Sequence, residues 1–233
     1  MYHVKALQLI TNKQNQPIMK NSILILLLCI GLLPAGAQRI VEKHIDFAPS
    51  GYVRMNFQIS DSIRIITWKK NEVYIKSSIN VNNNKNNDDY KMVFGETGNT
   101  INVSAKMEYK NNDSCNCCCN VHSVIMHEVY IPENADFSVE TINGNIIISG
   151  NTAEIRAKSI SGFIDIAVTP QRKADVKMRT ITGTMYSNIE LNTMSRRIKQ
   201  VGGGTVSAQL NGGGGKDIDL ETISGNIFFR KEG

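Results

Sequence analysis

The feature that most constrains the fold is an eight-residue segment that occurs four times in the second half of the chain. The copies span residues 139–146, 157–164, 178–185 and 220–227. Each contains an apolar residue, a charged residue, Thr or Ser, Ile, a small polar residue, Gly, any residue and a second apolar residue. The glycines are 18, 21 and 42 residues apart, so we expect one further degenerate copy near residue 204, within Val201–Val206. A repeat of about twenty residues predicts a solenoid, in which each unit buries its apolar face against the next.

Apolar and polar residues alternate within the repeats, and this alternation predicts strands rather than helices. Ile218 and Leu220 would share one face of a strand, while Asp219 and Glu221 share the other. We expect two short strands per repeat, with glycine at the bend because it tolerates a positive φ. Stacked strands lie about 4.8 Å apart, so equivalent hydroxyls would form a ladder beside a stack of aliphatic side chains. These hydroxyls belong to Thr141, Ser159, Thr180 and Thr222. The predicted fold class is all-β, a single-chain β-solenoid similar to a parallel β-helix, with about 20-residue rungs.

The N-terminal segment has the features of a secretory signal peptide. The apolar run Ile23–Leu33 follows Lys20 and precedes a small-residue cleavage site that ends at Ala37. This run is too short to span a membrane, and no other run reaches the roughly 18 apolar residues that a transmembrane helix needs. We therefore expect residues 1–37 to be a signal peptide, with residues 1–18 upstream of the true start. The exported chain, 38–233, would lie in the periplasm or at the cell surface and would not be transmembrane after cleavage.

The charge of the exported chain argues against nucleic acid as a partner. Removal of residues 1–37 takes away three lysines and no acid, which leaves 23 basic and 21 acidic residues. No cluster of Lys and Arg remains on one face, and an exported protein does not meet nucleic acid inside the cell.

The first half of the exported chain also alternates like strands. The segments are residues 39–47, 53–59, 63–68, 73–79, 90–94, 100–109 and 121–131. Trp68, the only tryptophan, could stack on a sugar ring or cover the end of the core; because no second aromatic residue adjoins it, we expect the second role. Loop insertions are predicted near residues 80–90 and 110–121, of which the first is rich in asparagine and has almost nothing to bury. The regular rungs are predicted to span residues 136–230.

A cysteine cluster is the one chemically unusual stretch of the sequence. It consists of Cys115, Cys117, Cys118 and Cys119, with His122 close by. In an oxidising compartment thiols tend to form disulfides, although neighbouring cysteines have poor geometry for them. Thiolates and an imidazole could instead bind Zn(II) or Cu(I), although the spacing lacks a CxxC motif. Free thiols are the third alternative. The sequence predicts no other cofactor.

Three segments together resemble a known family, the secreted bacterial β-strand-repeat proteins named putative adhesins. The segments are Ile63–Trp68 followed by Glu72-Val73, the phrase Val129-Tyr130-Ile131-Pro132-Glu133-Asn134-Ala135, and the repeated Thr/Ser-Ile-x-Gly units from Val139 to Phe229. The resemblance covers nearly all of residues 38–233. It implies a single β-helix-like solenoid on the cell envelope, and it supplies no catalytic residues.

The outward charges of the repeats do not form an acid–base constellation, so we expect no enzyme activity. These charges are Lys158, Asp165, Lys177, Arg179, Asp219 and Glu221. No histidine adjoins a recognisable nucleophile motif. We predict a non-catalytic envelope or surface protein that acts as an adhesion or interaction module, with glycans or other envelope proteins as partners. The alternative is a periplasmic metal-binding or redox-responsive protein that uses the Cys115–His122 cluster. Self-association is a third possibility, because the last repeat would leave an open strand edge at Phe228-Phe229.

Overall fold

The computed structural model describes residues 38–108, 122–150, 153–198 and 203–232. These residues contain fifteen strands and one short 3-10 helix, η1 (Asn87–Asp89), and no α-helix. Within the same ranges no helix is long and apolar enough to cross a membrane. The all-β fold class is therefore confirmed for the described residues, whereas the predicted signal peptide, residues 1–37, lies outside them.

The first seven strands cover the chain as far as the first repeat. They are β1 (Arg39–Asp46), β2 (Tyr52–Trp68), β3 (Glu72–Val81), β4 (Tyr90–Thr97), β5 (Thr100–Met107), β6 (Ser123–Pro132) and β7 (Asp136–Ser149). The remaining eight are β8 (Ile155–Ser161), β9 (Ile164–Val168), β10 (Ala174–Thr180), β11 (Met185–Ser187), β12 (Asn192–Ile198), β13 (Gly204–Leu210), β14 (Ile218–Ser224) and β15 (Ile227–Lys231).

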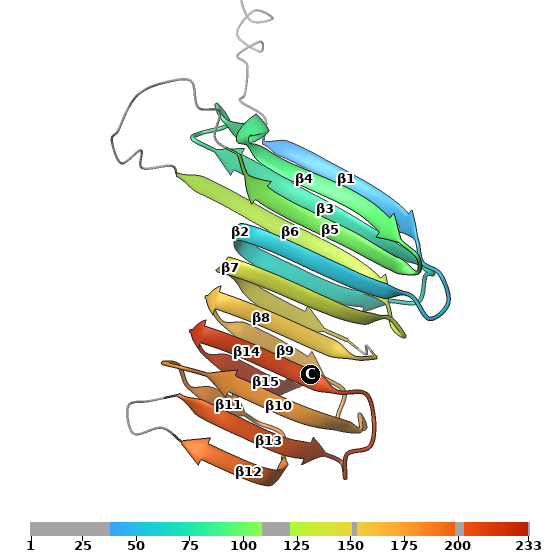
Figure 1. Cartoon of the computed structure of the whole chain (residues 1–233), viewed down its shortest axis with the longest axis vertical. Coiled ribbons are helices and arrows are strands. Elements are labelled where there is room, and N and C mark those ends of the chain that lie inside the picture. Colours follow the sequence, from blue (N-terminus) through green and yellow to red (C-terminus); the bar gives the residue numbers. More distant parts are fainter. Residues whose placement is uncertain (1–37, 109–121, 151–152, 199–202, 233) are drawn as a thin grey trace, which may run out of the picture. The chain divides into compact units, whose positions relative to one another are not determined.

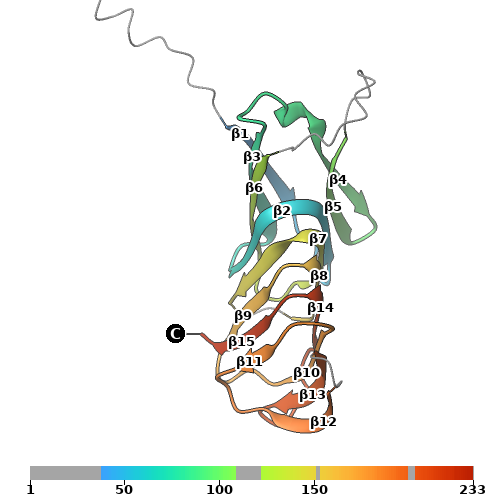
Figure 2. The same ribbon diagram turned by 90° about the vertical axis from the view of Figure 1, so that its left-hand side faces the viewer.

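All fifteen strands belong to one hydrogen-bonded sheet, which folds into two layers because β2 and β7 each bend from one layer into the other (Figures 1 and 2). In the first layer the N-terminal halves of β2 and β7 lie between β5–β4 on one side and β8, β14, β10, β13 and β12 on the other. In the second layer their C-terminal halves lie between β6, β3 and β1 on one side and β9, β15 and β11 on the other.

The core lies between the two layers and follows from the period-two alternation of the strands. In β14, for example, Ile218 and Leu220 are buried, while Asp219 and Glu221 are not. The largest fully buried side chains include Phe57, Phe137 and Phe229, from β2, β7 and β15. At about 25 cal/mol per Å² of apolar surface, this burial is the main stabilising contribution to the fold.

The four repeats form corners between the layers, and their glycines stack on one another. A Cβ added at Gly162, Gly225 or Gly183 would collide with the carbonyl oxygen of the glycine on the neighbouring strand. The predicted reason for glycine, a positive φ, is wrong for Gly183 and Gly225, which are not among the residues with positive φ. Close backbone approach is the common cause.

The predicted stack of hydroxyls is present, but three of the four hydroxyls donate to glycine carbonyls rather than to one another. Ser159 Oγ donates to Gly144 O at 3.1 Å, and Thr222 Oγ1 donates to Gly162 O at 3.1 Å. Thr180 Oγ1 lies 3.0 Å from Gly225 O in the same way. The isoleucines that follow these residues point outward; Ile142, Ile160 and Ile181 are exposed and Ile223 is half-buried.

The predicted order of the repeats, each stacked on the one before it in the sequence, is wrong at the C-terminal end. Strand β14 pairs in parallel with both β8 and β10, so the last repeat lies between the second and the third. Strand β15 likewise lies between β9 and β11 and is not an open edge. The prediction of a further repeat near residue 204 is also wrong, because β13 pairs with β10 in antiparallel orientation and does not stack in parallel like the other repeats.

The asparagine-rich segment after β3 is held by its own side chains. Asn82, Asn83 and Asn84 adopt positive φ, which asparagine tolerates better than most residues. Asn87 Oδ1 accepts from Val81 N at 2.8 Å, and Asn86 Nδ2 donates to Asp89 Oδ2 at 3.1 Å. These local hydrogen bonds take the place of a buried apolar face.

Candidate functional site

The predicted metal site is only partly within the described residues. Cys115, Cys117, Cys118 and Cys119 lie outside them, whereas His122 is described and exposed. The backbone of His122 pairs with Asn82, whose N–H donates to His122 O at 2.8 Å. Among the described residues no group of three or more His, Cys, Asp or Glu side chains is arranged to hold a metal ion. Zinc or copper binding by the cysteine cluster stays a prediction.

The outward charges of the first layer pair with one another across neighbouring strands. Glu221 lies between Lys158 and Arg179, at N–O distances of 3.9 and 3.8 Å, and Lys177 lies 3.9 Å from Asp219. A groove of about 390 Å³ runs over this layer and is lined by several of these groups together with Arg54, Glu140 and Arg156. The described contacts of these side chains include no nucleophile activated by a base, so they form a charge-balanced, solvated surface.

The second layer carries a row of aromatic side chains on its outward face, hereafter the aromatic row: His44, Tyr74, Tyr130 and Trp68. His44, Tyr74 and Tyr130 occupy paired positions on β1, β3 and β6. Trp68 ends β2, beside β6. The ring centroids of His44 and Tyr74 are 4.4 Å apart, those of Tyr74 and Tyr130 are 5.8 Å apart, and those of Tyr130 and Trp68 are 5.1 Å apart. Four strands thus build one aromatic surface.

Polar contacts at their rims hold the rings in place. Trp68 Nε1 donates to Glu72 O at 2.8 Å, and the Tyr130 hydroxyl donates to Glu128 Oε1 at 2.6 Å. His44 Nδ1 lies 3.3 Å from Glu72 Oε2. The Lys70 ammonium lies 4.6 Å from the centroid of the Trp68 ring, in cation–π geometry. Rings that are already fixed lose little conformational entropy when a ligand binds to them.

The phenols of the row stay neutral at physiological pH. Burial raises the pKa of Tyr74, and the nearby Glu42 carboxylate raises it further. The hydrogen bond to Glu128 raises the pKa of Tyr130. Both hydroxyls are therefore able to take part in neutral hydrogen bonds.

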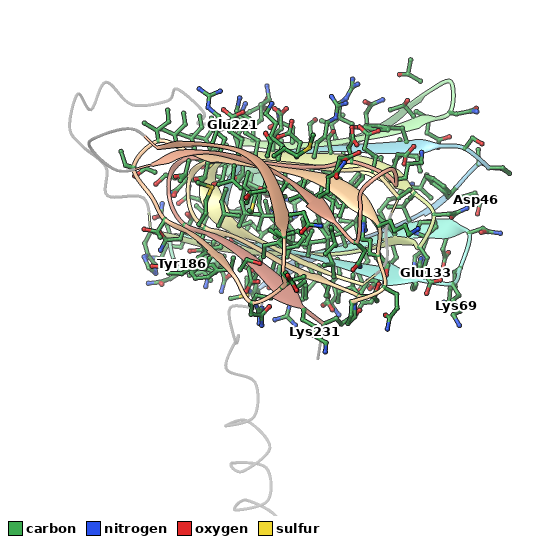
Figure 3. All side chains as sticks on the ribbon, turned by 90° about the horizontal axis from the view of Figure 1, so that it is seen from below. Asp46, Lys69, Glu133, Tyr186, Glu221 and Lys231 are labelled. Carbon is green, nitrogen blue, oxygen red and sulfur yellow. The ribbon has the colours of Figure 1, made fainter. Side chains whose placement is uncertain are left out.

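A small depression adjoins the row at Trp68. Its volume is about 190 Å³, and it lies between residues 69–71 on one side and Pro132, Glu133 and Asn134 on the other. Figure 3 places Lys69 and Glu133 together at one lateral edge, whereas Glu221 lies on the opposite layer. The row is therefore a stack of tilted rings with carboxylate, amide and ammonium groups at its edge.

The expectation that Trp68 covers the end of the core is wrong. Its indole is half-buried and lies beside Tyr130. Tyr130 belongs to β6, so this aromatic neighbour is distant in the sequence and becomes adjacent only in the fold. The signal was present in the alternation, because Tyr74 and Tyr130 occupy outward positions beside Lys76 and Glu128. Aromatic pairs across neighbouring strands stabilise a sheet, and a contiguous outward patch of them is also a feature of binding surfaces.

The comparisons with known proteins concern the fold. No protein-family model matches this sequence, and no curated protein sequence matches it. The crystal structure of a "putative cell adhesion protein" from Clostridium sporogenes aligns with a TM-score of 0.54 and 9% identity, covering 84% of this chain and 100% of that one. A "putative adhesin" from Bacteroides fragilis aligns at 0.30 and 8% identity, covering 83% and 98%. A "putative lipid binding protein" from Parabacteroides distasonis aligns at 0.27 and 11% identity, covering 83% and 97%.

The alignment with the Clostridium sporogenes protein shows that the two proteins share an all-β fold. The resemblance noted in the sequence, to proteins named adhesins, is therefore supported at the level of the fold.

Proposed function

We propose that the chain is a non-catalytic, exported binding module of the adhesin type, located in the periplasm or at the cell surface, and that its aromatic row binds a glycan. In this proposal the parallel strand pairs joined at the stacked glycine corners are the rungs of a β-solenoid, which provides a rigid scaffold for the row.

The aromatic row is the observation that carries the proposal. The rings of Trp68, Tyr74 and Tyr130 are partly open to solvent, and their exposed apolar surface suits the apolar face of a sugar ring. Around them the side chains of Glu72, Glu128 and Lys70 provide acceptors and a donor for hydroxyl groups. These rings point outward, so they do not pack in the core between the layers. Their polar atoms already have hydrogen-bond partners.

Charge further favours a neutral glycan over an acidic one. Within and beside the row Glu42 pairs with Lys76 at 3.2 Å, and Lys70 Nζ lies 3.5 Å from Glu72 Oε1. Cations and carboxylates are therefore balanced, and no free basic patch is present among these residues to attract a polyanion.

The proposal can be tested by direct binding, because Trp68 is the only tryptophan and its fluorescence reports on the row. The purified protein would be titrated with soluble neutral polysaccharides, namely a glucan, a mannan, a galactan and a xylan. We expect at least one to change the emission of Trp68 in a saturable manner. Tyr74→Ala should weaken that binding by about tenfold or more, since a stacked ring contributes on the order of 1 kcal/mol beyond its buried area.

The matched control is Tyr52→Ala, which removes an aromatic ring from the outward side of the other layer. This variant should bind like the unmodified protein. If none of the four polysaccharides changes the emission of Trp68, or if both variants lose affinity equally, the aromatic row is not a glycan site.

A further inference from the structure

A second aromatic cluster lies on the same outward face as the aromatic row, at the other end of the second layer. It consists of Tyr186 on β11, Phe228 on β15 and Phe163 at the corner before β9. Tyr186 and Phe228 are stacked, with centroids 5.2 Å apart and ring planes 8° apart, and Phe163 meets Phe228 edge-on at 6.0 Å. Tyr186 is 50% exposed; Figure 3 shows it, like Glu133, in the half of the view opposite Glu221, but at the other edge.

The strand register places both clusters on one side of the layer. Arg64 on β2 is paired with Glu128 and with Ile147, and Ile147 is paired with Asp165. Asp165 is paired with Phe228, and Phe228 with Tyr186. Because paired residues in a sheet point the same way, Phe228 and Tyr186 face outward on the same side as Glu128 and its neighbour Tyr130.

Partly apolar side chains connect the two clusters. Ile66, Ile147 and Ala167, from β2, β7 and β9, are half-buried and occupy outward positions between them. Charged groups also lie along this path: Arg230 makes a bidentate pair with Asp165 at 2.7 and 2.6 Å, and Arg64 on β2 is exposed. The aromatic and aliphatic side chains form a band across several strands. A contiguous apolar surface of this kind is more typical of a binding site than of a face that contacts only water.

Polar groups also flank this path. A depression of about 270 Å³ lies at the C-terminal ends of β2, β7, β9 and β15 and is lined by Thr67, Ser149 and the carboxylates Glu133 and Glu232, among others. Glu133 lines both this depression and the one beside Trp68. Hydroxyl and carboxylate groups along an apolar floor match the alternation of apolar faces and hydroxyls in a sugar chain.

From these observations we infer that the second layer binds one extended neutral polysaccharide chain across its strands, with the aromatic row and the Tyr186–Phe228–Phe163 cluster as its two ends. This inference rests on the proposed function and adds the length and the path of the ligand. From β6 to β15 there are four inter-strand steps, so Tyr130 and Phe228 lie about 20 Å apart. A single sugar cannot contact both clusters, whereas a linear chain can, and its affinity grows when the second contact forms.

The experiment uses oligosaccharides of increasing length, prepared from the polysaccharide that binds most tightly, and follows Trp68 emission and calorimetry. The unmodified protein should show a step increase in affinity of about tenfold or more once the oligosaccharide spans both clusters. Tyr186→Ala should abolish this step and leave the affinity for short oligosaccharides unchanged. Tyr186 is an exposed side chain, so its removal should not prevent folding.

The outcomes separate the two proposals. If binding depends on Tyr74 but does not increase with oligosaccharide length, the extended path is wrong and the aromatic row remains a site. The same holds if Tyr186→Ala leaves the affinity unchanged at every length. An equal loss for short and long oligosaccharides in Tyr186→Ala also overturns the extended path. Absence of any binding that depends on the aromatic row overturns both.

Discussion

The imidazole Nε2 of His127 lies 2.9 Å from the hydroxyl of Tyr90, inside the core where the two layers meet near the bend of β2. On the other side of the ring, Nδ1 lies 2.8 Å from Ser77 Oγ, and the Tyr90 hydroxyl donates to Ile59 O at 3.0 Å. These partners fit one neutral tautomer, in which Ser77 donates to Nδ1, and Nε2–H donates to Tyr90. The ring also stacks on Phe57 at 4.1 Å, and no carboxylate is among these contacts.

The first prediction concerns the pH dependence of stability. Burial lowers the pKa of His127 to about 3, whereas an unfolded histidine titrates near 6.5. Between these values the unfolded chain binds a proton that the folded chain does not, so the free energy of unfolding falls as the pH falls. At pH 4.5 the loss from this residue should be about 3 kcal/mol. Urea denaturation followed by Trp68 fluorescence, from pH 7.5 to 4.5, measures it.

The control is a pair of substitutions. The His127→Gln variant should be less stable at pH 7.5, because glutamine cannot reproduce both buried hydrogen bonds of the imidazole. Its free energy of unfolding should depend less on pH over this range. His122→Gln, at an exposed position, should keep the pH dependence of the unmodified protein. Parallel pH profiles for the His127→Gln variant and the unmodified protein would show that His127 does not carry the effect.

The second prediction concerns the hydroxyls that bridge the repeats. In Thr222→Val the carbonyl of Gly162 loses its hydrogen-bond donor, Thr222 Oγ1, while the shape of the side chain is nearly retained. A buried acceptor without its partner costs about 1–3 kcal/mol, so the free energy of unfolding should decrease by that order. Chemical denaturation at constant pH is the measurement.

Thr141 offers a matched comparison, because its buried hydroxyl has no hydrogen-bond partner among the described residues. The neighbouring strand has Ser60 rather than glycine at this corner, and the register shifts there between Ile59 and Ser62. Thr141→Val should therefore be neutral or slightly stabilising, since it removes an unsatisfied polar group. Equal destabilisation by Thr141→Val and Thr222→Val would contradict the proposed role of the hydrogen bond.

Much of the fold could be predicted from the sequence, because both of its signals are local. Alternation with period two predicts strands that bury one face, and a repeated Gly at the end of each predicts a corner. The order of the repeats could not be predicted. The inward residues of β8, β10 and β14 are similar, with Thr or Ser at the corner, so any two of these strands are able to stack. The choice of β14 as the neighbour of both others depends on long-range packing.

The candidate site could not be predicted either, for a different physical reason. Its four side chains come from four strands, and His44 and Tyr130 are far apart in the sequence. Only the pairing of β1 with β3 and of β3 with β6 brings His44, Tyr74 and Tyr130 into one row. An outward aromatic residue is detectable in each strand, but the partners that make it a surface depend on the topology of the sheet.

The last prediction tests the close packing of the corners. Gly225 lies where a Cβ would collide with the carbonyl oxygen of Gly162, a backbone atom that cannot move without breaking the neighbouring corner. Gly225→Ala should therefore lower the free energy of unfolding by about 3 kcal/mol or prevent folding, as forced overpacking does. Gly95→Ala, in β4, is the control, because no atom lies within 4 Å of the added Cβ and the φ of Gly95 is not positive. It should be neutral or slightly stabilising, since alanine restricts the unfolded chain. Thermal and urea denaturation of both variants decide the matter: if Gly225→Ala were as stable as Gly95→Ala, the glycine stack would have no part in specifying how the repeats pack.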